Sequence, residues 1–164
     1  MIEQPTNYVL NDQETNISIE QGFTICLNFF SSLWPSMEPK LQDMGREESI
    51  VNELFFLDVC MGFECSAQWN EAVFRITKVS KQDQRKGLKL TEKETFLCAF
   101  EFCRIYDKIF KFQLSYILNL VQSMLDHPSQ HALEWGLWKK WVDSSFKSSF
   151  YFDINWNDGP YSLD

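Results

Sequence analysis

Apolar side chains at helical spacing constrain the fold of this chain more than any other feature. The clearest run follows Thr91 and Glu94, which have the spacing of a capping box at the start of a helix. The apolar residues that follow at intervals of three or four or their multiples include Phe96, Phe100, Cys103, Tyr106, Phe110, Ile117, Val121 and Met124. No charge appears between Lys111 and Asp126, and a helix that is apolar on all sides is usually packed on all of them. The sequence therefore predicts a central helix from Thr91 to about Met124.

Ser18 and Gln21 form a second capping-box pair, and apolar residues at helical spacing follow them. We expect this helix to end at Pro35, because the residue before a proline is driven out of the α region. Two more helices are predicted, over residues 47–61, or on to about 79 if Gly62 does not break the helix, and over about 128–146. Residues 80–90 are polar and contain a glycine, which indicates a connecting loop.

The C-terminal tail changes period. Phe150, Phe152, Ile154 and Trp156 alternate with more polar neighbours, which is the spacing of a β-strand. The strand would pair with residues 8–10, and an extended tail lying across the helices is the equal alternative. With 164 residues and 45% hydrophobic content, the chain is long and apolar enough for one core. We predict one domain over residues 1–164, a mainly all-α bundle of about five helices around a central apolar helix.

Motifs that carry chemistry are absent from the sequence. There is no GxSxG, no glycine-rich phosphate loop and no HExxH, so we expect no enzyme, cofactor or metal site. His127 and His131 are four residues apart, with Asp126 or Glu134 as a possible third ligand, but zinc sites need three or four protein ligands. A small enzyme that uses His127 or His131 with a buried carboxylate or thiol stays as an alternative.

The cysteines and the apolar stretches bear on location. The five cysteines are Cys26, Cys60, Cys65, Cys98 and Cys103. An odd number of cysteines without a secretory signal favours reduced thiols in the cytoplasm, and we expect the core to contain them as small hydrophobic residues. The longest uncharged apolar stretch spans residues 112–125, which is shorter than the roughly 20 residues that cross a bilayer. We therefore expect a cytoplasmic protein.

Charge is unevenly distributed along the chain. The net charge of −8 divides into −10 over residues 1–74, +5 over 75–111 and −3 over 112–164. The basic segment is interpreted as a solvated turn that neutralises nearby acids, and the acidic total argues against direct binding of nucleic acid. The acids are densest at Glu38, Asp43, Glu47, Glu48, Glu53, Asp58 and Glu64. Such a cluster either keeps the protein dispersed or forms a face complementary to a basic protein.

A small, acidic, helical chain without an active-site motif resembles bacterial toxin-immunity proteins, including those of contact-dependent growth-inhibition systems. The resemblance lies in overall character and rests on no signature residues. It implies that the acids of residues 38–64, with exposed aromatics such as Trp69 and Trp156, bind a basic toxin, for example a nuclease, and block its active site. An alternative is a DNA mimic or regulatory adaptor, whose carboxylates would imitate phosphates and engage several partners. The sequence leaves the oligomeric state open.

Overall fold

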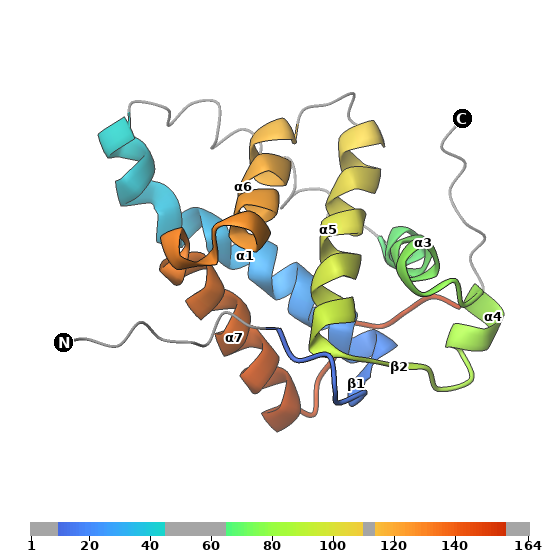
Figure 1. The fold of residues 1–164 in the computed structure, drawn as a ribbon. Helices are drawn as coiled ribbons and strands as arrows, with labels where there is room; N and C mark the ends of the chain where they lie inside the picture. Colours follow the sequence, from blue (N-terminus) through green and yellow to red (C-terminus); the bar gives the residue numbers. More distant parts are fainter. Residues whose placement is uncertain (1–9, 45–64, 110–113, 157–164) are drawn as a thin grey trace.

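The computed structural model describes residues 10–44, 65–109 and 114–156, with side chains of residues 34–44 left out (Figure 1). The helices are α1 (Ile19–Met44), α3 (Ser66–Thr77), α4 (Lys81–Gln84), α5 (Glu92–Ile109), α6 (Ser115–Asp126) and α7 (Ala132–Lys147), with a short 3₁₀ turn at Pro128–Gln130. The strands are β1 (Ile17–Ser18) and β2 (Lys89–Leu90). The predicted mainly-α class is confirmed. None of the helices in these ranges combines the length and apolar character needed to cross a membrane.

Helix α5 occupies the middle of the fold, where it contacts α1, α3 and α6. Its capping box is formed in both directions: the Thr91 N–H donates to Glu94 Oε1 at 2.9 Å, and the Glu94 N–H donates to Thr91 Oγ1 at 3.0 Å. The prediction of one helix to about Met124 is wrong. Helix α6 is separate and stands beside α5 in Figure 1, and the Asp107 carboxylate accepts the Leu114 N–H at 2.9 Å before α6 begins. The apolar spacing continues because both helices face one core.

Helix α1 begins at the second predicted capping box. The Gln21 N–H donates to Ser18 Oγ at 3.0 Å, and the Ser18 N–H donates to Gln21 Oε1. The predicted end at Pro35 is wrong, because α1 continues to Met44. A proline removes one N–H donor and crowds one preceding carbonyl, at a cost of about 3 kcal/mol, which bends or weakens a helix without having to end it.

The N-terminal strand pairs with the segment that was predicted as a loop. β1 and β2 are antiparallel, with Ile17 opposite Leu90 and Ser18 opposite Lys89. Residues 80–90 therefore contain α4 and β2 as well as a turn, and the loop prediction is only partly correct. The predicted helix over residues 47–61 lies outside the described residues. Beyond it, α3 ends at Thr77, where Lys78 takes the left-handed conformation that commonly terminates a helix.

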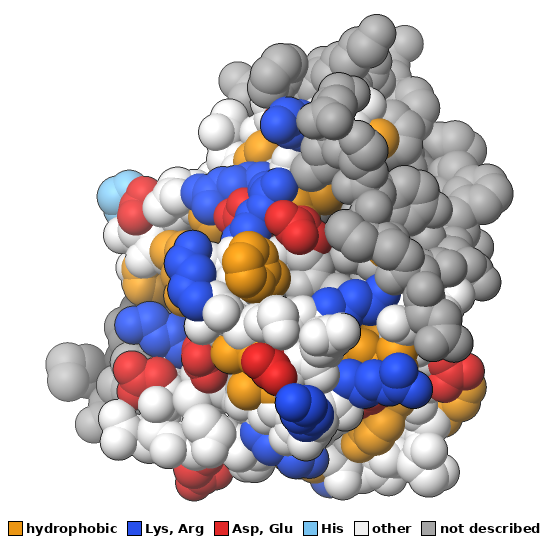
Figure 2. Space-filling model, turned by 90° about the vertical axis from the view of Figure 1, so that its right-hand side faces the viewer, with side chains coloured by type: hydrophobic (Ala, Val, Ile, Leu, Met, Phe, Trp, Pro, Cys, Tyr) orange, Lys and Arg blue, Asp and Glu red, His pale blue; other side chains and the backbone are white. Residues whose placement is uncertain are grey.

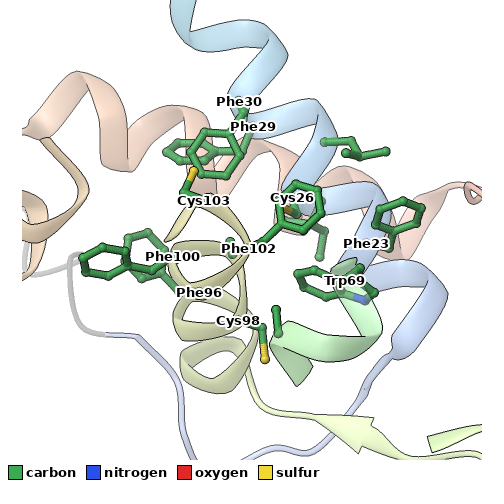
Figure 3. Close-up of a cluster of buried hydrophobic side chains, with 14 of the residues drawn as sticks. Phe23, Cys26, Phe29, Phe30, Trp69, Phe96, Cys98, Phe100, Phe102 and Cys103 are labelled. Carbon is green, nitrogen blue, oxygen red and sulfur yellow. The ribbon is translucent and has the colours of Figure 1, made fainter. Parts of the chain in front are cut away.

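The core is built from aromatic rings contributed by α1, α3, α5 and α7, and Figure 3 shows those of α1, α3 and α5. Trp69 lies at its centre, with its ring centroid 6.0 Å from that of Phe23 and 6.1 Å from that of Phe102. The indole N–H of Trp69 donates to the Ile19 carbonyl at 3.0 Å, so its one polar atom is satisfied inside the core. On α7, Trp138 packs edge-on against Phe96 of α5. These contacts fix the positions of the helices that carry the surface described next.

Candidate functional site

The C-terminal tail lies extended across the helices, and this is the alternative of the two sequence predictions that the structure confirms. The Phe152 N–H donates to Thr24 Oγ1 of α1 at 2.8 Å, and the Asn155 N–H donates to Ser66 Oγ at the start of α3 at 3.0 Å. Ile154 is buried in the core between these two bonds. Residues 8 and 9 of the predicted partner strand lie outside the described residues. The tail is thus held at three successive points.

Large aromatic side chains remain exposed on and beside this tail. Phe146 is 50% exposed, Phe150 67% and Phe152 39%. The rings of Phe150 and Phe152 meet at a centroid distance of 5.7 Å and an interplanar angle of 72°. We call Phe150 and Phe152 the tail surface, whereas Phe146 lies on α7 beside Asn16 and Ile17. Contiguous exposed aromatic side chains are typical of surfaces that bind another protein, because their burial is favourable and costs little side-chain entropy.

A cavity of about 550 Å³ opens where the tail passes between α1 and α3, and we call it the tail cavity. Its lining comprises Glu20, Phe23 and Leu27 of α1, Cys65 and Ser66 at the start of α3, and Phe152, Asp153, Ile154, Asn155 and Trp156 of the tail. The carboxylates of Glu20 and Asp153 have no hydrogen-bond or ion-pair partner among the described residues. No lysine, arginine or histidine occurs among the described residues of the lining. The cavity is therefore aromatic and negatively charged.

The predicted partner-binding residues fall into three groups. Glu47, Glu48, Glu53, Asp58 and Glu64 lie outside the described residues, and Glu38 and Asp43 belong to α1 without described side chains. Their role stays a prediction. Trp156 is half-buried rather than exposed and lines the tail cavity, and its role in binding stays a prediction. The expectation that Trp69 is exposed is wrong: its exposed fraction is 0%, because it fills the space between α1, α3 and α5.

The basic segment carries local ion pairs. Arg75 joins Glu71 and Glu101, each at 3.2 Å, and Arg104 also joins Glu101 at 3.0 Å. The face that carries α3 and α4 shows Lys and Arg side chains with Asp and Glu side chains between them (Figure 2). This mixture supports the interpretation of a solvated segment whose charges are neutralised locally.

The histidines have different environments. His127 is exposed at the end of α6. His131 lies 2.7 Å from Ser123 Oγ through Nε2 and 3.1 Å from Glu134 Oε2 through Nδ1, and Glu134 is fully buried. Within the described part of the chain, no three metal-ligating side chains come together. The sequence pointed to His131 and Glu134, and it missed Ser123, which reaches His131 only because the turn at Pro128–Gln130 reverses the chain.

The described cysteines are buried, and none of them forms a disulfide with another described residue. Burial raises the pKa of Cys26, Cys98 and Cys103 well above the usual range of a thiol, with smaller contributions from neighbouring thiols or carboxylates. Figure 3 shows the sulfur atoms of Cys98 and Cys103 well apart along α5. A thiol without access to water or to its thiolate form does not act as a nucleophile, so the prediction of core cysteines is confirmed for these positions. Cys60 lies outside the described residues.

Searches of protein-family models, of curated proteins and of solved structures find no match for this chain.

Proposed function

We propose that this chain is an acidic binding protein that neutralises a basic protein partner, in the manner of an immunity protein that blocks a cognate bacterial toxin. The observation that carries the proposal is the tail surface beside the tail cavity. There, the exposed pair Phe150 and Phe152 lies beside two carboxylates, those of Glu20 and Asp153, that have no partner among the described residues, in a chain of net charge −8. Aromatic anchors next to acidic groups fit a partner whose surface is basic and partly apolar.

The two kinds of group have different tasks. Full burial of a phenylalanine side chain contributes about 1.5–3 kcal/mol, so the two rings together supply at most about 3–6 kcal/mol. Association itself costs an estimated 4–15 kcal/mol in lost translational and rotational freedom, so the rings alone do not give tight binding. The charge therefore has to contribute, through faster encounter and through pairing with cations of the partner.

The test is affinity capture of partners from the producing cells at about 0.1 M salt and again at about 1 M salt, where the Debye length falls from about 10 Å to about 3 Å. We expect one predominant basic partner, captured at low salt, whose association rate falls steeply with salt. The variant Phe150→Ser should raise the dissociation rate, and the triple variant Glu47→Lys, Glu48→Lys, Asp58→Lys should lower the association rate. Unchanged kinetics in both variants would refute the proposal, and capture of several nucleic-acid-binding proteins would favour the DNA-mimic alternative.

A second candidate function is favoured by Ser123, His131 and Glu134. With the Nδ1–H of His131 donating to the Glu134 carboxylate, Nε2 accepts the Ser123 hydroxyl, which is the order of groups in a serine hydrolase. Ser123 Oγ would attack an ester carbonyl, its proton would pass to His131 and then to the leaving alcohol, and water would release the acid. Neither Ser123 nor His131 lines the tail cavity, so the two candidate sites are separate.

Labelling with a fluorophosphonate probe tests this second candidate. The chain should be labelled at Ser123, and His131→Asn should abolish the labelling while the protein stays folded by circular dichroism. If the folded chain takes up no probe at Ser123, the three residues form a structural clamp between α6 and α7, and the hydrolase candidate is refuted.

A further inference from the structure

We propose that the tail cavity is the acceptor site for an arginine side chain of the basic partner. This inference rests on the proposed function and deepens it, because it names the group of the partner that is recognised and the place where it binds.

The lining combines aromatic faces with carboxylates. Phe23, Phe152 and Trp156 come from two separate segments, and the rings of Phe23 and Phe152 meet edge to face at 6.4 Å. Glu20 and Asp153 enter from the same two segments. Aromatic faces attract cations, and carboxylates pair with them, so both parts of the lining favour the same ligand charge. The volume of about 550 Å³ lies within the range of sites that enclose small ligands.

One feature of the cavity favours the opposite charge. The N-terminal end of α3 faces the cavity, because Cys65 and Ser66 at that end both line it. The N-cap residue Cys65 makes no side-chain capping bond. A helix N-terminus is equivalent to roughly half a positive charge, and its effect falls off within the first turn. Two carboxylates carry four times that charge with the opposite sign. The net charge of the described lining therefore stays negative, and a cation is the preferred occupant.

The guanidinium of arginine fits this lining better than the ammonium of lysine. It is planar, it stacks on aromatic rings, and its fork of N–H donors pairs with two carboxylate oxygens at once. It is also less strongly hydrated than an ammonium group, so it loses less on entering a half-enclosed site. The ammonium group of lysine carries the same charge on one small group and does not stack on aromatic rings.

The tail is held in place before the partner arrives. The hydrogen bonds from Phe152 to Thr24 and from Asn155 to Ser66 fix the backbone on both sides of Asp153, and Ile154 is buried between them. The carboxylate of Asp153 is thereby presented at the cavity without further ordering of the backbone. A preformed site avoids much of the entropy cost of binding.

The experiment uses the whole chain and three capped tripeptides with arginine, lysine or citrulline between two glycines. Citrulline has nearly the shape of arginine but no charge. Binding is followed by the NMR shifts of the Trp156 indole and of the Phe152 and Asn155 amides. We expect saturable shifts with arginine, several-fold weaker binding with lysine, and at least about tenfold weaker binding with citrulline, since hydrogen bonds to a charged group are worth that factor or more.

Asp153→Asn and Glu20→Gln should each weaken binding of the arginine peptide by about tenfold, by loss of a charge-assisted bond. Asp143→Asn is the matched control: it removes the same charge from an exposed acid that does not line the tail cavity, and binding should stay within about twofold. Equal binding of citrulline and arginine, or equal losses in the Asp153 and Asp143 variants, would overturn the inference.

The proposed function fails by a different result. If the arginine peptide binds at the cavity as expected while the chain captures no basic partner, the site stands and the neutralising function is refuted. If a basic partner is captured but Asp153→Asn and Asp143→Asn leave its dissociation rate equally unchanged, the neutralising function stands and the arginine site is refuted.

Discussion

Replacing Gly22 by alanine should destabilise the protein, although alanine is the better helix former. Gly22 is a buried residue of α1, and a Cβ built on it would lie 3.0 Å from Cζ2 of Trp69, 3.4 Å from Cγ2 of Thr95 and 3.6 Å from Cδ1 of Leu90. The first distance is shorter than carbon atoms tolerate without movement. Trp69 cannot withdraw easily, because its ring is fully buried and its indole N–H is bonded to the Ile19 carbonyl. The contact therefore has to be relieved by a shift of α1 against α3.

The expected magnitude follows from two opposing contributions. Forcing an extra methyl group into a packed core costs about 1–3 kcal/mol, and replacing a mid-helix glycine by alanine gains about 0.5–1 kcal/mol. Because the fully buried Trp69 has no room to move aside, the cost lies in the upper part of its range, at about 2–3 kcal/mol, and we expect a net loss of about 1–2 kcal/mol. For a chain of this length, that loss lowers the Tm by roughly 2–8 °C.

Gly136 provides the matched control. It is an exposed position within α7, and a Cβ built on it would meet nothing within 4 Å. Gly136→Ala should therefore stabilise the protein by about 0.5–1 kcal/mol. Urea denaturation followed by tryptophan fluorescence measures both variants. If Gly22→Ala is as stable as the original protein, or gains as much as Gly136→Ala, the expectation that Trp69 leaves no room for a Cβ at position 22 is refuted.

Three further perturbations test other parts of the structure. Glu92→Ala should lower the free energy of unfolding by about 2–4 kcal/mol in denaturant melts. The nearly buried carboxylate of Glu92 pairs with Lys139 at 2.8 Å and accepts the indole N–H of Trp138. A loss below about 1 kcal/mol would contradict a structural role for this pair. Phe150→Ser should change the Tm by less than about 2 °C, because the side chain is already mostly in water. Burial raises the pKa of the core cysteine thiols in the folded state, so the protein should keep its full free energy of unfolding below the unfolded-state pKa. Above about pH 9 that free energy should fall by up to about 1.4 kcal/mol per pH unit for each thiol. Denaturant melts at pH 8 and pH 10, compared with those of a Cys98→Ala variant, measure this slope; an equal slope in the variant would contradict it.

Local signals in the sequence were the most reliable. The capping boxes at Ser18 and Thr91 need only residues three apart, and both were predicted correctly. Where the outcome depends on packing, the sequence was less informative. It predicted an end at Pro35, because the rule for the residue before a proline ignores how the rest of a helix is held. It also predicted one helix over 91–124, since two helices that face one core share one apolar pattern.

The candidate site could be predicted only in part. The alternating pattern of the tail predicted a strand or an extended segment, and the structure confirms the extended segment. The role of Trp156 in binding stays a prediction. The tail cavity is assembled from α1, the start of α3 and residues 152–156, which are far apart in the sequence. The sequence therefore could not show that the carboxylates of Glu20 and Asp153 lie at one site. Trp69 was misplaced for a related reason: the sequence gives a tryptophan on a helix, and only packing decides which side of that helix is buried.

The way the tail is tied down has a consequence for synthesis on the ribosome. The hydroxyl oxygens of Thr24 and Ser66 accept the backbone N–H groups of Phe152 and Asn155, and Ile154 completes the core between these two bonds. When residues 19–147 have left the ribosomal exit tunnel, every long helix of the described chain is present, and yet the groove between α1 and α3 is still uncovered. Residues 152–155 therefore complete the fold only after these helices have emerged. A chain truncated after residue 147 would present the same helices with their aromatic core open to chaperones and proteases.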